Sequence, residues 1–100
     1  MESNLENKAI IRGGVYYFQA GDAKALIQMC KDNNYKILGI DSVIITEKKT
    51  QPVLEHSIDY SDQVKRGNWD EAIAFIQSKA NLNYMFEVVY DKKDESLEMN

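Results

Sequence analysis

The sequence predicts an α+β fold, namely a small, mostly antiparallel sheet of about four to five strands with two helices packed on one face. The length supports this fold class, because 100 residues, 44% of them hydrophobic, can bury one core and form a single domain. The expected elements run in the order strand, helix, strand, strand, strand, helix, strand. Two helices cannot easily cover both faces of such a sheet, so we expect both helices on the same side.

The N-terminal third is expected to form a strand and a helix. Residues 9–18 (AIIRGGVYYF) read as extended, with β-branched and aromatic residues around the glycines at 13–14, which mark a bulge or a close approach of backbone. Asp22 is the expected N-cap of the following helix, and the two asparagines at 33–34 suit its exit. Cys30 lies on the apolar stripe of this helix, which places it in the core.

The middle of the chain is expected to be extended. Residues 35–41 (YKILGID) are apolar on both faces and therefore form a central strand. After a short turn at residues 41–42, residues 43–47 form a second, antiparallel strand. Residues 48–52 are a loop that ends at a proline, and residues 53–61 resume an extended pattern.

Alternation along residues 53–61 gives this expected strand two different faces. One face carries Leu54, His56, Ile58 and Tyr60, and the other carries Val53, Glu55, Ser57 and Asp59. A catalytic triad is excluded by this pattern, because Ser57 and Asp59 would point away from His56. We therefore expect His56 to pair with Tyr60 or with a backbone carbonyl.

A second helix and a last strand complete the expected fold. Asn68 caps the helix together with Glu71, in an asparagine version of the capping box. The inner face of this helix is expected to carry Trp69, Ala72, Ile73, Ile76 and Ala80. Residues 84–90 (YMFEVVY) alternate as a strand. Both chain ends are polar, so we expect one domain over residues 1–100 with an ordered core at about 9–91.

Composition and spacing exclude several classes of function. Sixteen acidic against 12 basic residues give a net charge of −4, which argues against nonspecific binding of nucleic acid. The one cysteine and one histidine lie far apart, and no glycine-rich phosphate loop is present, so we expect no metal or other cofactor. The sequence contains neither an apolar run that could span a bilayer nor a secretion signal, so we expect a cytoplasmic protein. The single histidine lacks a second convergent group for acid–base chemistry, so we expect that the protein is not an enzyme.

Acidic residues concentrate between residues 41 and 71, where seven acids and four bases give a net charge of −3. Aromatic and histidine side chains are interleaved with these acids, a pattern typical of a surface that binds a cationic protein. The candidate partner-binding residues are Asp41, Glu47, Glu55, His56, Asp59, Tyr60, Asp62, Trp69 and Asp70.

Five parts of the chain carry a family resemblance: the helix that ends near Asn34, ILGID (37–41), TQPVLEHSIDYSD (50–62), WDEAIAFI (69–76) and FEVVYD (86–91). They resemble the immunity proteins of bacterial polymorphic toxins, and in particular the relatives of the immunity protein of the anticodon-cleaving (tRNase) colicin. The resemblance implies a stoichiometric inhibitor, made beside its cognate toxin, that binds tightly and covers the toxin's active surface. In those relatives the acidic surface of the immunity protein stands in for the RNA substrate.

We therefore expect this protein to neutralise a cationic toxin, an RNase or tRNase, as a monomer or weak dimer when free, without contacting nucleic acid or membrane. Asp41 belongs to the shared ILGID segment, whereas the other candidate residues are chosen from charge and exposure. Two alternatives stay open: a small ligand-binding or regulatory module in which Tyr60 and Trp69 line a pocket, and a hydrolase centred on His56.

Overall fold

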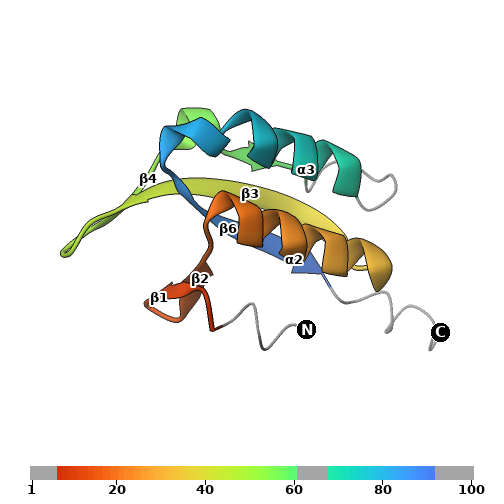
Figure 1. Cartoon of the computed structure of the whole chain (residues 1–100), viewed down its shortest axis with the longest axis horizontal. Helices are drawn as coiled ribbons and strands as arrows, with labels where there is room; N and C mark the ends of the chain where they lie inside the picture. Colours follow the sequence, from red (N-terminus) through yellow and green to blue (C-terminus); the bar gives the residue numbers. More distant parts are fainter. Residues whose placement is uncertain (1–6, 61–67, 92–100) are drawn as a thin grey trace.

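The computed structural model describes residues 7–60 and 68–91, and within these residues the chain forms two α-helices, six strands and two short 3₁₀ helices (Figure 1). In chain order they are β1 (Ile10–Arg12), β2 (Val15–Tyr17), α2 (Ala20–Asp32), β3 (Lys36–Ile45), β4 (Thr50–Pro52), η1 (Leu54–His56), β5 (Ile58–Asp59), α3 (Trp69–Ser78), η2 (Ala80–Leu82) and β6 (Met85–Asp91). The predicted polar tails are residues 1–8 and 92–100, of which 1–6 and 92–100 lie outside the described residues.

Strand β3 is the hub of the four-stranded sheet, because β4, β5 and β6 all pair with it in antiparallel orientation. Residues Gly39, Ile40 and Val43 each have one partner on β6 and a second on β5 or β4. β6 therefore lies along one edge of β3, while β4 and β5 share the other edge at different positions. An isolated bridge between Phe18 and Phe86 attaches the end of β2 to the outer edge of β6.

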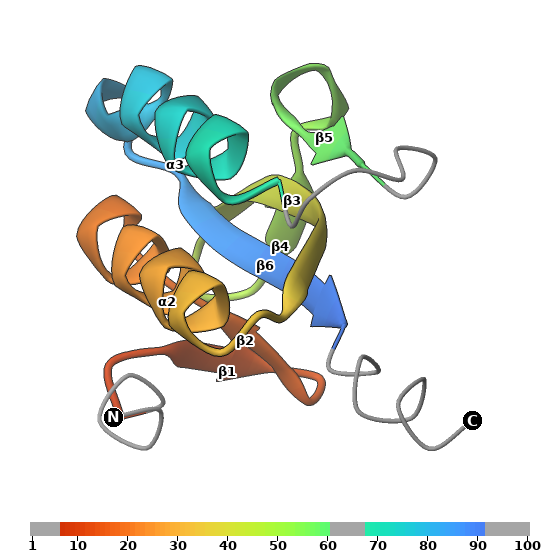
Figure 2. The same cartoon turned by 90° about the vertical axis from the view of Figure 1, so that its right-hand side faces the viewer.

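Both helices cover the same face of this sheet, as Figure 2 shows, so the predicted α+β architecture is confirmed. The core lies between the helices and β3 and β6, and its fully buried side chains include Ile27 and Cys30 of α2, Ile76 of α3, Ile37 and Ile40 of β3 and Phe86 of β6. The prediction that Cys30 is a core residue is confirmed.

Residues 9–18 form a hairpin, so the prediction of one extended segment is wrong. β1 pairs with β2, and Gly13 and Gly14 form the two-residue turn between Arg12 and Val15. Their φ angles of +59° and +81° are left-handed, which is the backbone that a tight hairpin turn of this length needs. The glycine pair therefore reverses the chain and does not mark a bulge within a single strand.

The expected turn at residues 41–42 does not exist, because β3 runs without a break through these two polar residues. Ser42 is fully buried, and its hydroxyl donates a hydrogen bond to the backbone oxygen of His56 at 2.5 Å. Its backbone N–H donates to the hydroxyl of Ser57 at 3.0 Å. A distant segment thus satisfies the polar groups of Ser42, so a serine is tolerated in a buried strand.

The segment that follows β3 also differs from the prediction. Residues 50–52, which were expected to be part of a loop, form the edge strand β4. Its last residue is a proline, which is tolerated because an edge strand does not need every backbone N–H as a donor. Residues 53–61 are not one strand, since a 3₁₀ turn, η1, precedes the two-residue strand β5. The expected alternation therefore fails: Leu54 and Tyr60 were predicted on the same face, but Leu54 is 79% exposed whereas Tyr60 is buried.

Helix α2 begins at Ala20, so Gln19 and not Asp22 occupies the N-cap position. Asp22 lies in the first turn, where its negative charge still favours the positive end of the helix dipole. The predicted exit is confirmed: Asn33 is the C-cap, and Asn34 has a left-handed φ of 62°.

Helix α3 starts after Asn68 as predicted, but the expected capping box is absent. Asn68 adopts a left-handed φ of 65° and makes no side-chain cap; its buried amide donates instead to the backbone oxygen of Ile37 at 3.1 Å. Ala72 and Ile76 are buried as expected. Ala80 was expected on the same inner face, but it lies beyond the helix, in η2, and is exposed.

The last strand is confirmed at Met85–Asp91, where Phe86 and Val88 are buried against the helices. A further contact ties the two hairpins together, because the Arg12 guanidinium donates to the backbone oxygen of Thr46 at 2.8 Å. Neither of the helices in the described part of the chain has the length and apolar character that crossing a bilayer requires.

Asn68 gives a test of this fold, since it supplies both a left-handed residue and a buried hydrogen bond. Asn68→Gly keeps the backbone conformation and loses the bond to Ile37, which should lower the free energy of unfolding by about 1 kcal/mol. Asn68→Ala should lower the free energy of unfolding by about 1–2 kcal/mol more than Asn68→Gly does, because the left-handed conformation is also unfavourable for alanine. Urea unfolding measures both values. Asn83→Gly, at an exposed left-handed position, is the control, and equal losses in the two Asn68 variants would contradict the role of the backbone conformation.

Candidate functional site

The face of the sheet that carries no helix is the candidate functional site, and we call it the open sheet face. Directly opposed residues of an antiparallel pair point to the same side of a sheet. Because Ser42 and Phe86 are paired and buried on the helix side, the neighbouring pair of Asp41 and Glu87 lies on the other side. By the same register, the open sheet face includes Tyr17, Lys36, Gly39, Asp41, Val43, Pro52, Asp59, Met85, Glu87, Val89 and Asp91.

Asp41 and Glu87 form a carboxyl pair at the centre of this face. Both side chains are half-buried, and a hydrogen bond can join the two carboxyl groups when one of them carries a proton. Burial is the main cause that raises the pKa of Glu87 above its ordinary value, and the negative charge of Asp41 and the hydrogen bond raise it further. Among the described residues, neither carboxyl group forms an ion pair with a lysine or arginine.

Tyr17 extends this row of polar groups onto β2. The bridge between Phe18 and Phe86 sets the register, so that Tyr17 lies beside Glu87. Burial raises the pKa of the Tyr17 hydroxyl, and the charges of Glu87 and Asp41 add to this effect. A tyrosine and two carboxyl groups from three different strands therefore act on one another electrostatically at this site.

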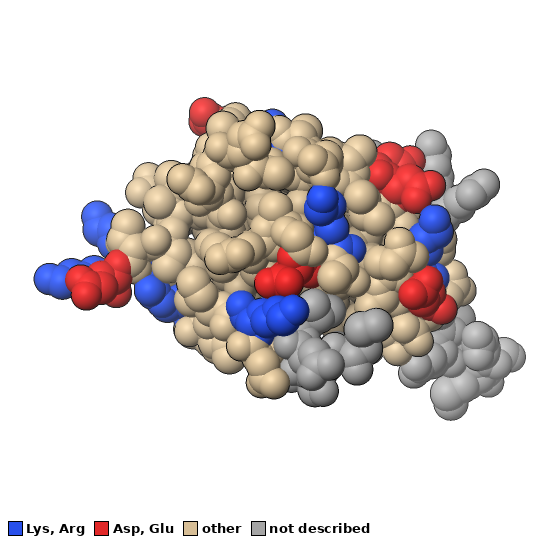
Figure 3. Space-filling model, in the orientation of Figure 1, with Lys and Arg blue, Asp and Glu red and all other residues tan. Residues whose placement is uncertain are grey.

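The helix side has a different charge pattern. Figure 3, in which the helices face the viewer, shows acidic and basic residues interspersed over this surface. Two of its aspartates have cationic partners: Asp22 lies 3.9 Å from Lys8, and Asp70 lies 3.2 Å from Lys31. The carboxyl pair on the open sheet face has no such compensation within the described residues.

The sequence-predicted partner-binding residues are spread over several parts of the molecule. Asp41 and Asp59 share the open sheet face, Glu47 lies exposed between β3 and β4, and Glu55 and His56 lie on η1. Trp69 and Asp70 begin α3, and Asp62 lies outside the described residues. Among the candidates that the structure describes, it thus places Asp41 and Asp59 together on the open sheet face.

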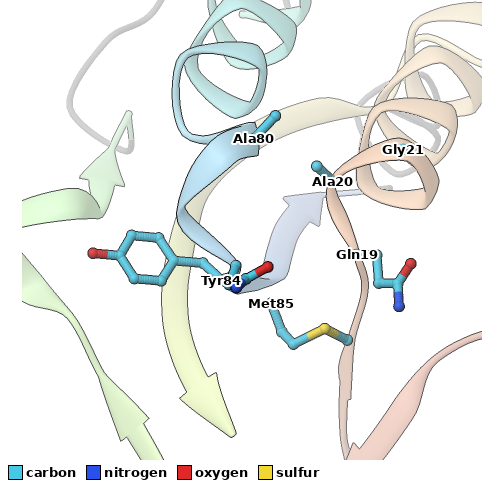
Figure 4. A pocket seen from close by; sticks show the side chains of 7 residues that line it. Gln19, Ala20, Gly21, Ala80, Tyr84 and Met85 are labelled. Atoms are coloured by element: carbon cyan, nitrogen blue, oxygen red, sulfur yellow. The ribbon is translucent and has the colours of Figure 1, made fainter.

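His56 is paired with a residue that the sequence did not indicate. Its Nδ1 lies 2.8 Å from the hydroxyl of Tyr84, so the expected partner, Tyr60 or a backbone carbonyl, is corrected. Figure 4 shows the Tyr84 ring pointing away from the start of α2. The hydroxyl of Ser57 donates to the backbone oxygen of Val53 at 2.9 Å, so it is directed to the backbone rather than to the His56 ring.

Tyr60 and Trp69 are packed against the core in this structure. Tyr60 is only 4% exposed, and its hydroxyl has no hydrogen-bond partner among the described residues. Burial, followed by the charge of Glu71, raises the pKa of this hydroxyl. The indole N–H of Trp69 donates to the backbone oxygen of Tyr35 at 2.8 Å. Neither ring is therefore presented as a free surface anchor.

Sequence reasoning missed Tyr17 and Glu87. Glu87 is the one charged residue in YMFEVVY (84–90), and it lies between the core-facing residues Phe86 and Val88. This charge at an alternating position was the available signal that Glu87 faces away from the core. Its neighbour Asp41 is 46 positions earlier in the sequence, and only the register between β3 and β6 places the two together.

A metal site and a small-molecule pocket are two further kinds of site that the described residues could form. No group of three or more histidine, cysteine, aspartate or glutamate side chains in the described part of the chain is placed to hold a metal ion. A hollow of about 370 Å³ at the start of α2 is lined by residues of α2, η2 and β6 (Figure 4). Tyr84 is the only titratable residue that lines it, and the ring of Tyr84 points away, so the hollow offers no acid–base group.

Comparison with models of known protein families gives no match for this chain, and no curated protein matches it significantly.

Glu87→Gln tests the carboxyl pair. The folded protein holds the Glu87 proton to a higher pH than the unfolded chain does, so stability falls as pH rises from the ordinary glutamate pKa of 4.5 through the raised folded value. Glutamine stays neutral and can still donate to Asp41. We expect the melting temperature of Glu87→Gln to exceed that of the parent by a few degrees at about pH 7, since about 1 kcal/mol corresponds to about 4–8 °C, and by much less at about pH 4.

Glu55→Gln is the matched control for this experiment, because Glu55 is an exposed glutamate on η1. It should show no such pH-dependent gain. If Glu87→Gln is less stable than the parent protein at both pH values, the two carboxyl groups do not repel one another in the folded state.

Proposed function

We propose that this protein is an immunity protein, a cytoplasmic inhibitor that binds and neutralises a cationic bacterial toxin through the open sheet face. The observation that carries this proposal is the carboxyl pair of Asp41 and Glu87, which is half-buried, uncovered by either helix and without a cation from the described residues. Proteins rarely hold two carboxyl groups together unless a proton or a cation reduces their repulsion. A basic side chain from a partner would supply that cation.

The kind of partner follows from this chemistry. A nuclease that binds RNA needs a positively charged cleft, and a surface that carries carboxylates can occupy such a cleft in place of the RNA phosphates. Opposite charges would raise the association rate and fix the orientation of docking. The toxin we propose is therefore a basic RNase or tRNase, and the protein itself performs no catalysis and needs no cofactor.

The family resemblance supports the same proposal. Asp41 ends the ILGID segment, which resembles the corresponding segment of the colicin immunity proteins, and Glu87 lies in the FEVVYD segment, which belongs to the same resemblance. These two segments are the paired strands β3 and β6, so the residues that carry the resemblance include both members of the carboxyl pair.

No specific observation favours the two alternatives. For a hydrolase centred on His56, the ring contact within the described residues is with Tyr84 at 2.8 Å, and the hydroxyl of Ser57 is bonded to backbone. For a ligand-binding module, the hollow at the start of α2 is lined by neither Tyr60 nor Trp69.

The first experiment tests whether a neighbouring gene encodes a basic toxin that this protein binds and neutralises. Co-expression should restore growth to cells that make this toxin, and the purified proteins should form a complex whose association slows as salt rises. A neighbourhood without a toxic, basic protein, together with no partner in a pull-down, would remove the proposal.

Charge substitutions locate the interface in that complex. Asp41→Asn should weaken toxin binding about tenfold or more, equivalent to about 1.4 kcal/mol, with little loss of thermal stability. Asp32→Asn removes the same charge from the helix side, at an exposed position of α2, and should leave binding unchanged. Isothermal titration calorimetry and thermal melting give the two quantities. Equal effects of both substitutions on binding would place the interface elsewhere.

A further inference from the structure

A hollow of about 340 Å³ opens on the open sheet face, next to the carboxyl pair. It is lined by Leu38, Gly39, Asp41, Ile58, Asp59 and Val89, which come from β3, β5 and β6. We call it the β5 hollow. Its volume lies at the lower end of the range for small-ligand sites, so it suits a single long side chain better than an extended molecule.

The shape of this hollow depends on Gly39. A Cβ atom at this position would lie 3.0 Å from the backbone oxygen of Ile58, closer than side-chain carbon atoms normally approach. The missing side chain thus allows β5 to pair closely with β3 and leaves backbone as the floor of the hollow. Val89, opposite Gly39 on β6, is 37% exposed and forms an accessible wall.

The lining combines acidic and apolar groups. Asp41 is half-buried and Asp59 is exposed, and apolar residues make up most of the remaining lining. Such a site suits a ligand that has an apolar stem and a positively charged head, because the stem can contact valine and leucine while the head meets the carboxylates. A bare metal ion does not fit, since within residues 7–60 and 68–91 no metal-ligating group of three side chains is present.

Two basic residues lie on this face or beside it. Arg12 donates to the backbone oxygen of Thr46 at 2.8 Å, and Lys36, at the start of β3, lies opposite Asp91. Neither forms an ion pair with Asp41, so the described part of the chain does not neutralise this carboxyl group itself.

We propose that the β5 hollow binds one arginine side chain of the partner protein, with its guanidinium between Asp41 and Asp59 and its methylene stem against Val89. This inference rests on the proposed function and names the chemistry that the open sheet face recognises. Arginine fits better than lysine because its planar group has five donors, can bond two carboxylates at once and is less strongly hydrated than an ammonium.

The experiment uses N-acetyl-L-arginine amide as the probe and two-dimensional ¹H–¹⁵N NMR of the whole protein as the readout. Titration should shift the backbone signals of Gly39, Asp59 and Val89, with a dissociation constant on the order of 1 mM, as expected for so small a ligand. The neutral analogue N-acetyl-L-citrulline amide and the lysine analogue should each bind at least about fivefold more weakly.

Two substitutions test the walls of the hollow. Asp59→Asn removes a carboxylate, and Val89→Phe fills the space from an exposed position; each should weaken the arginine shifts at least about fivefold. Asp32→Asn on α2 is the matched control and should leave the shifts unchanged. The dispersion of the NMR spectrum shows whether each variant is folded.

Equal shifts with the citrulline analogue, or shifts spread over both faces of the molecule, would overturn the inference. The outcome is separable from that of the proposed function. Toxin neutralisation without a localised arginine response rejects the hollow alone. A localised arginine response in a protein that neutralises no toxin keeps the hollow as an arginine site and rejects the immunity function.

Discussion

β3 and β6 pair over seven residue pairs, and this register determines both faces of the sheet at once. It places Ile40 with Val88 and Ser42 with Phe86 on the helix side, where they complete the core. The same register puts Asp41 beside Glu87 on the opposite side. A slip of one residue would exchange the two faces, because side chains alternate along a strand. Hydrophobic packing on one side therefore holds two carboxyl groups together on the other.

The parts of the fold that follow a local period could be predicted from the sequence. The apolar stripes of α2 and α3 and the alternation of β6 depend on neighbouring residues alone, so these elements were found within a few positions. The predictions failed at residues whose position depends on contacts with a segment far away in the sequence. Ser42 was expected in a turn because serine is common there, but it is buried in β3 since the backbone at His56 and the hydroxyl of Ser57 satisfy its polar groups.

The residues of the candidate site could likewise be predicted only in part. Asp41 and Asp59 were identified from charge, and they do share one face, although the strand alternation used to place Asp59 does not exist around η1. Tyr17 and Glu87 could not be found in this way, because a hairpin and a seven-pair register bring them to Asp41. His56 was expected to have a nearby partner, yet its partner, Tyr84, comes from the segment after α3.

The position of β6 also has a consequence for biosynthesis. β6 lies between β2 and β3 in space, although it is the last of the described strands to leave the ribosome. Until then the nascent chain carries β3 with one edge unfilled and helices that lack Phe86 and Val88 as a packing surface. Unpaired edges and exposed apolar faces are the features that promote aggregation and chaperone binding during translation. The core and the carboxyl pair consequently cannot be complete before residues 85–91 have been synthesised.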